Sequence, residues 1–345
     1  MIYTIKEIAK LSGVSAGTVD RVLHKRGRVS TETKKRICDI LEKLDYQPNA
    51  MAKSLALRRY PTNVGIVSHV QPNFSNYAIE QSELGLQAAF SELKGSGINF
   101  RHVYSRNFDI EHQISLIDEL IDDGIVALMI QPISSETLLA KLASLNIPVF
   151  CYSNDIIQSY PHFFTGIDNY KAGETVAGLF HLLNPKLHKM AFISSSLSML
   201  GNLRRSQGFH EKLNQLYGGN IIRCEIQAIN DDDVTYANVY ELLRKNRDID
   251  SLFFSSGAVK SCFKIFKELG LLGKICIIAF DLSDTIVQNI SDNYVAAAIY
   301  QNSFQHSYLS VKQIYDYIVS GILPDKHEIF VDFEIIIKEN LIDHL

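Results

Sequence analysis

The sequence lacks most features that mark secreted, membrane and zinc-finger proteins. Its five cysteines are an odd number without a C-x-x-C pair, which favours reduced cytosolic thiols over disulfides or a zinc site. Apolar runs such as Ile275–Phe280 are far shorter than the ~18 residues that cross a bilayer. Lys6, Glu7 and Lys10 interrupt the N-terminal apolar stretch, so no signal-peptide core is present. We therefore expect a cytoplasmic protein with no membrane partner.

Motifs of the common enzyme classes are missing as well. The sequence holds no G-x-S-x-G, H-E-x-x-H, P-loop or G-x-G-x-x-G pattern. Asp231–Asp233 resemble calcium ligands, but the glycine and glutamate of a calcium loop are absent, so we interpret them as a helix N-terminus. We expect a protein that is not an enzyme and that binds neither a metal nor a cofactor.

Length and charge indicate several folding units, of which the first is basic. The chain has 345 residues, and one domain commonly holds about 100–200. Residues 1–60 contain 13 Lys and Arg against six Asp and Glu, whereas the remainder contains 21 against 32. A head of charge +7 on a body of charge −11 suggests a polyanion-binding module. Chance clustering on a solvated helix would give the same charge.

Residues 1–46 have the pattern of three short helices. Thr4 and Glu7 form a capping box before the first helix, and Gly13 ends that helix. Ser15 and Ser30 are expected to cap the second and third helices. The positions expected to face inward are Ile5, Ile8, Ala9, Leu11, Val19, Val22, Leu23, Ile37, Ile40, Leu41 and Leu44. Two short helices around a tight turn containing glycine have the helix-turn-helix layout.

A longer pattern of spaced residues spans positions 3–57. It reads T-I-K-E-I-A-K-L-S-G-V-S-x-x-T-V-x-R-V-L, then V-S-x-x-T and Y-x-P-N-x-x-A-x-x-L. This pattern resembles the DNA-binding head of LacI/GalR-type transcription regulators. The resemblance implies that the second helix enters the major groove and that hydroxyl groups hold phosphates. The DNA-contacting positions that it implies are Thr4, Ser15, Ala16, Gly17, Thr18, Asp20, Arg21, His24, Ser30, Thr33, Asn49, Ala52 and Leu55.

Two of these positions depart from the family. Asp20 stands where the family usually has serine, so it either reads a cytosine amino group or pairs with a basic neighbour such as Lys25. Gly17 has no side chain to read a base and costs about 1 kcal/mol of helix propensity. Among the base-facing positions, Arg21 can make a bidentate contact to guanine; the plainer alternative is a solvated surface arginine.

Residues 47–61 join the head to the body. The segment QPNAMAKSLAL is a short helix that is marginal alone. The resemblance implies a hinge helix that folds when two copies pair over DNA, with Leu55 as a wedge in the minor groove. The alternative is an ordinary linker with Leu55 packed on the body.

Residues 62–345 alternate apolar runs of strand length with amphipathic helices. One series holds VGIVSHV, NFRHVYS, VALMIQP and PVFCYS, and the pattern restarts at Lys189 with MAFISS, IIRCEI, SLFFSS, ICIIAF and AAAIYQ. This predicts two α/β lobes with parallel sheets and a cleft where strands end. The body resembles the periplasmic-binding-protein-like fold of the effector domains in the same regulator family. The expected fold class is α/β, with an all-α helix-turn-helix head before a two-lobed Rossmann-like domain.

Polar residues near the strand ends are the candidate ligand groups. The resemblance places an effector-binding arginine at Arg205, and Asp281 ends the IIAFD strand, so the pair could donate to and accept from sugar hydroxyls. Ser256 falls where the family often has asparagine. The candidate effector residues are Tyr77, Asn154, Asp155, Asp168, Arg205, Ser256, Asp281 and Gln301. For each of them a loop or capping role is the alternative.

The sequence thus predicts a homodimeric, ligand-responsive transcription regulator, in the first place a repressor. Its partners would be a pseudo-palindromic double-stranded operator and a sugar or sugar derivative. One alternative is a solute-binding protein of a sugar transport system, which the basic head opposes. The other is a sugar-acting enzyme, which would need an acid/base pair that we do not find.

Overall fold

The computed structural model describes residues 5–23, 27, 29–44, 50–70, 77–106, 108–157, 161–194, 196–197, 199–227, 232–255 and 262–344. They form two compact units. One unit combines residues 1–62 with 93–99 and 312–325, and the other combines residues 63–92, 100–311 and 326–345.

The first unit begins with the three predicted helices, α1 (Ile5–Ser12), α2 (Ala16–Leu23) and α3 (Thr31–Lys43). Their shared core is small and consists of Ile8, Ala9, Val19, Val22 and Ile37. The prediction that Leu11 faces inward is wrong, because its side chain is 57% exposed. The buried stripe of α1 runs instead through Ile8 and Ser12, whose hydroxyl donates to the Ile8 carbonyl oxygen at 2.6 Å.

Helix α4 (Ala50–Arg59) belongs to the same unit and ends against the turn at Gly97. Gly97 has φ +87°, and a Cβ there would lie 2.3 Å from the Leu57 carbonyl oxygen, so only glycine fits. The Thr62 amide donates to the Gly97 carbonyl oxygen at 3.0 Å. Of the predicted hinge segment, the described residues from Ala50 onward are helical, and its dependence on DNA stays a prediction.

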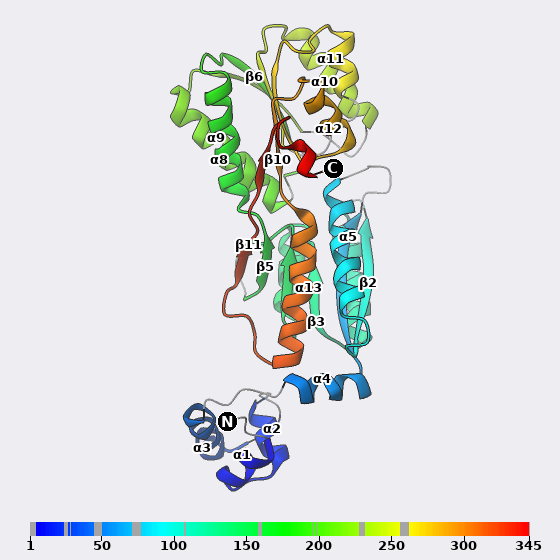
Figure 1. Ribbon diagram of the computed structural model, residues 1–345, viewed down its shortest axis with the longest axis vertical. Helices are drawn as coiled ribbons and strands as arrows, with labels where there is room; N and C mark the ends of the chain where they lie inside the picture. The colour runs from blue at the N-terminus through cyan, green and yellow to red at the C-terminus, as the bar shows by residue number, and fades with distance from the viewer. Residues whose placement is uncertain are drawn as a thin grey trace. The chain divides into compact units, whose positions relative to one another are not determined.

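The second unit contains two six-stranded sheets. Figure 1 shows helices packed around the strands of both. The first has the order β11-β5-β4-β3-β1-β2 and the second the order β12-β10-β9-β8-β6-β7. The strands of the first are β1 (Thr62–Val70), β2 (Ile98–Arg106), β3 (Ile125–Ile130), β4 (Val149–Tyr152), β5 (Phe163–Gly166) and β11 (Glu328–Phe330). Those of the second are β6 (Lys189–Ser194), β7 (Ile222–Gln227), β8 (Ser251–Phe254), β9 (Cys276–Phe280), β10 (Ala297–Tyr300) and β12 (Glu334–Ile336).

The strand pairing is mainly parallel, as the alternating sequence pattern predicted. Strands β3, β4 and β5 pair in parallel, and so do β6, β8, β9 and β10. Strand β12 pairs antiparallel with β10 at the edge of the second sheet. Parallel strands need long crossover connections, which the helices provide.

Helices cover the sheets. Each sheet and its helices form one lobe of the second unit. The first lobe, around the first sheet, has α5 (Tyr77–Glu92), α6 (Ile110–Asp122), α7 (Glu136–Ala143) and the start of α13 (Ser303–Ser320). The second has α8 (Asn169–Leu183), α9 (Leu200–Tyr217), α10 (Asp232–Lys245), α11 (Cys262–Glu268) and α12 (Asp284–Ser291), and a 3-10 turn follows at Leu341–His344. Along β6, Ala191 and Ile193 enter one core while Met190 and Phe192 enter another. Both faces of the second sheet are therefore covered, as in other doubly wound α/β domains.

Helices α8 and α9 cross closely through two glycines. A Cβ on Gly173 would lie 2.1 Å from the Arg205 carbonyl oxygen, and one on Gly208 would lie 2.0 Å from the Tyr170 carbonyl oxygen. Neither position tolerates a side chain without separation of the helices. This crossing fixes where α9 presents Arg205.

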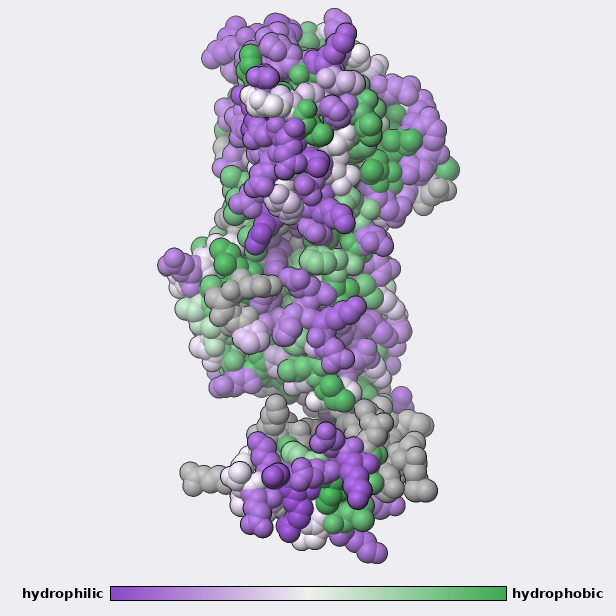
Figure 2. All heavy atoms as spheres, turned by 90° about the vertical axis from the view of Figure 1, so that its left-hand side faces the viewer, coloured by the Kyte–Doolittle hydropathy of each residue, from purple (hydrophilic) through white to green (hydrophobic). Residues whose placement is uncertain are grey.

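The chain passes between the two lobes at three places: from β5 to α8, from β10 to α13 and from β11 to β12. Polar and apolar side chains are interspersed on the face drawn in Figure 2. Among the described residues, no helix combines the length and the apolar character that a membrane crossing requires.

Candidate functional sites

Two S-x-x-T pairs cap the N-termini of α2 and α3. The Thr18 amide donates to Ser15 Oγ at 3.2 Å, and the two hydroxyl oxygens lie 2.9 Å apart. At α3, the Thr33 amide donates to Ser30 Oγ at 3.2 Å and the Ser30 hydroxyl donates to Thr33 Oγ1 at 2.8 Å. Each helix therefore begins with two hydroxyl groups at its N-terminus, the end of a helix that favours phosphate.

The outer face of α2 carries the predicted base-reading positions. Gly17, Asp20 and Arg21 are exposed, whereas Ala16 is half-buried and packs on the head core. Leu55 on α4 is 65% exposed. Thr4, His24, Lys25 and Asn49 lie outside the described residues, as does the side chain of Ala52.

Arg205 is the buried cation of the second unit, with 4% of the residue exposed. Its guanidinium carbon lies 3.5 Å from the centroid of the Phe280 ring. Nη2 donates to Asn169 Oδ1 at 2.6 Å, and Nη1 donates to the Ser255 carbonyl oxygen. Burial lowers the pKa of Arg205 to about 10, and the charge of Asp281 opposes that shift. Arg205 therefore remains charged at neutral pH.

Asp281 is the buried anion of the same region and follows β9 in a left-handed conformation, with φ +64°. Gln301 Nε2 donates to both carboxylate oxygens at 2.9 Å. Burial raises the pKa of Asp281 to about 6, and the Arg205 charge opposes this rise. Arg205 and Asp281 are thus electrostatically coupled. Their hydrogen bonds go to other groups, from Arg205 to Asn169 and Ser255 and from Gln301 to Asp281.

Several buried polar atoms nearby have no hydrogen-bond partner within the described part of the chain. They are Arg205 Nε, Ser255 Oγ, Ser303 Oγ and His306 Nε2. His306 is fully buried, its Nδ1 lies 3.1 Å from Ser153 Oγ, and burial lowers its pKa to about 4. A ligand with hydroxyl groups could supply partners to such atoms.

Tyr77 begins α5 and lies next to this group. Its ring centroid is 6.5 Å from that of Tyr300, and its side chain packs against the core of the second lobe. Burial is the main cause of its raised pKa, and Tyr300 and Asp281 add to it. Tyr77 is therefore placed to offer a ring face near Asp281, while Ser256 lies outside the described residues.

The other predicted ligand groups have structural partners. Asn154 Nδ2 donates to the Pro132 carbonyl oxygen at 2.6 Å, and its Oδ1 accepts from the Gly201 amide at 2.9 Å, which ties the lobes together. Asp168 caps α8 by accepting from the Lys171 amide at 3.0 Å. Asp155 accepts from the His162 ring.

Asp155 and Asp168 line a cavity of about 390 Å³ together with Arg204, Tyr170 and Glu328. Arg205, Asp281 and Gln301 are outside this lining. The structure therefore distributes the predicted effector residues over two places. Sequence reasoning missed Asn169, Phe280 and His306; Asn169 and Phe280 directly adjoin predicted residues, but nothing in the sequence singles out His306.

Comparisons with known proteins concern the family and the fold. Residues 4–49 match the family model for bacterial regulatory proteins of the lacI family, and residues 67–321 match the periplasmic binding protein domain. The HTH-type transcriptional regulator DegA of Bacillus subtilis is 27% identical over 215 residues, which cover 62% of each protein. The match thus spans less than two thirds of DegA.

A longer match is the ribose operon repressor of Halalkalibacterium halodurans, which is 25% identical over 320 residues and 90% of each chain. The solved structure of GanP, a glucose-galactose binding protein from Geobacillus stearothermophilus, has a TM-score of 0.71 at 20% identity. The structural match covers 81% of this chain and 99% of GanP, and it shows that the two proteins share a fold.

The three-helix head, the two-lobed body and these matches point to one family. The head matches the lacI model over the residues that form α1, α2 and α3, and the domain model covers most of the body. The chain belongs to the lacI family of bacterial regulatory proteins and carries a periplasmic binding protein domain.

Proposed function

We propose that this chain is a sequence-specific, DNA-binding transcription repressor that acts as a homodimer and responds to a sugar or sugar derivative. The observation that carries the proposal is the presence, in one chain, of an exposed reading helix and a buried Arg205–Asp281–Gln301 group. A transport solute-binding protein would have no use for the head. The proposal places the protein in the cytoplasm with its DNA.

The head supports DNA binding through geometry and charge. The capped N-termini of α2 and α3 suit phosphate oxygens, and the exposed cations Lys34, Lys35 and Arg36 lie on α3. Arg21 is exposed on α2, where it could reach a guanine edge. Two heads related by two-fold symmetry would then read a pseudo-palindrome.

The buried group supports a neutral polyol as effector. A guanidinium donates, a carboxylate accepts and an amide does both, so adjacent hydroxyls could satisfy all three. The unpartnered atoms of Ser255, Ser303 and His306 offer further contacts. The relative from Halalkalibacterium halodurans is, by its name, a repressor of a ribose operon, which favours a sugar as the ligand class here.

The proposed response is a shift of the two lobes when the effector binds between them. Regulation of this kind requires two states in which the effector makes different contacts. Ligand closure would act through the three crossings between the lobes, one of which, from β10 to α13, contains Gln301.

Selection of operators from random DNA tests this proposal. We expect the full chain to enrich a pseudo-palindrome whose half-sites lie about one helical turn apart. Binding to that sequence should weaken steeply with salt, because phosphate contacts release counterions. A thermal-shift screen of pentoses, hexoses and their phosphates and acids would identify the effector. Enrichment of no consensus, or of a non-palindromic one, would refute the proposed DNA reading.

A further inference from the structure

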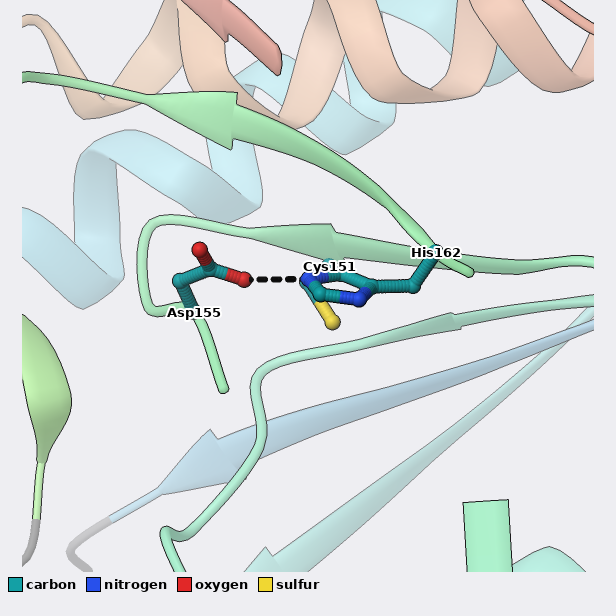
Figure 3. A group of neighbouring side chains, drawn as sticks. All are labelled: Cys151, Asp155 and His162. Carbon is teal, nitrogen blue, oxygen red and sulfur yellow. Dashed lines mark hydrogen bonds and ion pairs between the residues drawn. The ribbon is translucent and has the colours of Figure 1, made fainter. Parts of the chain in front are cut away.

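Three side chains of the first lobe converge beside β4 and the start of β5. Cys151 lies on β4, Asp155 follows that strand and His162 precedes β5. Their donor atoms all lie within 4.8 Å of one another. Figure 3 shows the Asp155 carboxylate and the His162 ring pointing at each other, with the Cys151 sulfur beside the ring.

This group is buried but borders a cavity. Cys151 is 0% exposed and His162 is 6% exposed, whereas the Asp155 side chain is 18% exposed. Asp155 also lines the cavity of about 390 Å³ described above. An ion could therefore reach the group from the Asp155 side, and water could occupy a free coordination position there.

The donor set suits a borderline-soft divalent cation. Zinc binds thiolate sulfur at about 2.3 Å and imidazole or carboxylate atoms at about 2.0–2.2 Å, so tetrahedral donors lie roughly 3.3–3.6 Å apart. His162 Nε2 and Asp155 Oδ1 are 2.7 Å apart. Zinc binding would increase the distance between His162 Nε2 and Asp155 Oδ1 by less than an ångström. It would also bring the Cys151 sulfur closer to both atoms.

Charge balance favours the same cation. A thiolate and a carboxylate buried together need a charge of +2 for neutrality, and a divalent ion supplies it.

The backbone around His162 is fixed by His327. The His162 carbonyl oxygen accepts from His327 Nδ1 at 3.0 Å, and the neighbouring Phe163 ring stacks on His327 with centroids 5.2 Å apart. These contacts limit the movement of the backbone that carries the imidazole.

We propose that Cys151, Asp155 and His162 form a zinc site in the first lobe, with a fourth position open to water from the cavity. The spacing C-x3-D-x6-H follows no common zinc motif, which is why the sequence predicted no metal. The bound ion would join the end of β4 to the start of β5, the strand that leads into α8.

Zinc stoichiometry of the metal-free full chain tests the site. After dialysis against buffered micromolar free Zn²⁺, we expect one equivalent per chain in the wild type. Cys151→Ser and His162→Gln should each lose that equivalent, whereas Cys224→Ser, which alters a half-buried thiol on β7, should keep it. Co²⁺ should give a thiolate charge-transfer absorption that Cys151→Ser alone among the cysteine variants abolishes.

Circular dichroism should show that the variants are folded, and Asp155→Asn, at the partly exposed member, provides a third variant with the same expected loss. Zinc binding below one equivalent in the wild type would overturn the proposal. Retention of the equivalent in folded Cys151→Ser and His162→Gln would overturn it as well, and would leave an Asp155–His162 hydrogen bond without a metal role.

Discussion

Buried histidines hold their imidazole rings neutral in the second unit. Burial lowers the pKa of His306 from 6.5 to about 4, and it lowers those of His69 and His102 to about 4 as well. The unfolded chain therefore binds more protons than the folded chain between about pH 6.5 and pH 4. Each of these groups makes the fold less stable as the pH falls through that window. The pKa of Asp281 is raised to about 6, so its effect on stability has the opposite sign: it makes the fold more stable as the pH falls.

We predict that wild-type protein loses more stability than His306→Gln between pH 7 and pH 5. The difference in the free energy of unfolding should be about 2 kcal/mol, from the two pKa values of His306. Urea unfolding of both proteins at the two pH values measures it, and the other titrating groups cancel in the comparison. Equal losses in the two proteins would show that His306 is not held neutral.

Arg21 is the exposed side chain on α2 that can specify a base. We predict that Arg21→Ala lowers operator affinity by roughly 1–3 kcal/mol and relaxes one base position in both half-sites. Arg36→Ala, at an exposed arginine of α3, is the matched control and should leave the consensus unchanged. Repeated selection with each variant decides, and an unaltered consensus for Arg21→Ala would assign Arg21 to the solvated surface.

At the scale of elements, the α8–α9 crossing sets the position of Arg205. We predict that Gly208→Ala destabilises the fold by about 1–3 kcal/mol or more. It should also weaken effector binding, because the added Cβ would clash with the Tyr170 carbonyl oxygen. Gly178→Ala is the control on α8: nothing lies within 4 Å of its Cβ, so it should stabilise by up to about 1 kcal/mol. Thermal unfolding and effector titration test both, and a neutral Gly208→Ala would disprove the close crossing.

Helix α4 carries Leu55 on an exposed surface. We predict that Leu55→Ala weakens specific DNA binding and reduces the bend of the bound operator, because an apolar wedge would no longer open a base step. Effector affinity of the free protein should stay nearly the same and serves as the control. If affinity and bend angle both remained unchanged, residues 47–61 would be an ordinary linker.

An element can be predicted from the sequence when the residues that determine it lie close together along the chain. Ser15, Ser30 and Gly13 fixed the head helices through caps and a left-handed residue, all within a few residues. Leu11 was misjudged because a three-helix core needs only a narrow stripe of each helix. Strands β5, β11 and β12 have only three or four residues each. This is too few for a periodic pattern of apolar residues that would mark them as strands in the sequence.

The site was partly predictable for a related reason. Arg205, Asp281 and Gln301 stand out because polar residues follow apolar strands or interrupt a motif. His306 and Asn169 reach the same region through helix packing between distant segments, which no single stretch of sequence records. The same holds for the contact of His162 with Asp155 across a loop.

The whole molecule combines a basic head with an acidic ligand-binding body. The proposed homodimer would bring two heads to one operator and give each chain its own effector site. Under this account, the effector changes the affinity for DNA, and DNA changes the affinity for the effector by the same factor. Residues that hold the effector should therefore be separable from residues that hold the operator.

Operator binding by the full chain, followed by fluorescence anisotropy during titration with the effector, measures this separation. We predict that the wild type responds, that Arg205→Ala and Asp281→Ala bind the operator but no longer respond, and that Arg204→Ala responds normally. Arg204 is the matched control because it is exposed, adjoins Arg205 on α9 and lines the cavity of about 390 Å³ instead of joining the buried group. A normal half-maximal effector concentration in both Arg205→Ala and Asp281→Ala would show that the effector does not bind at this buried group.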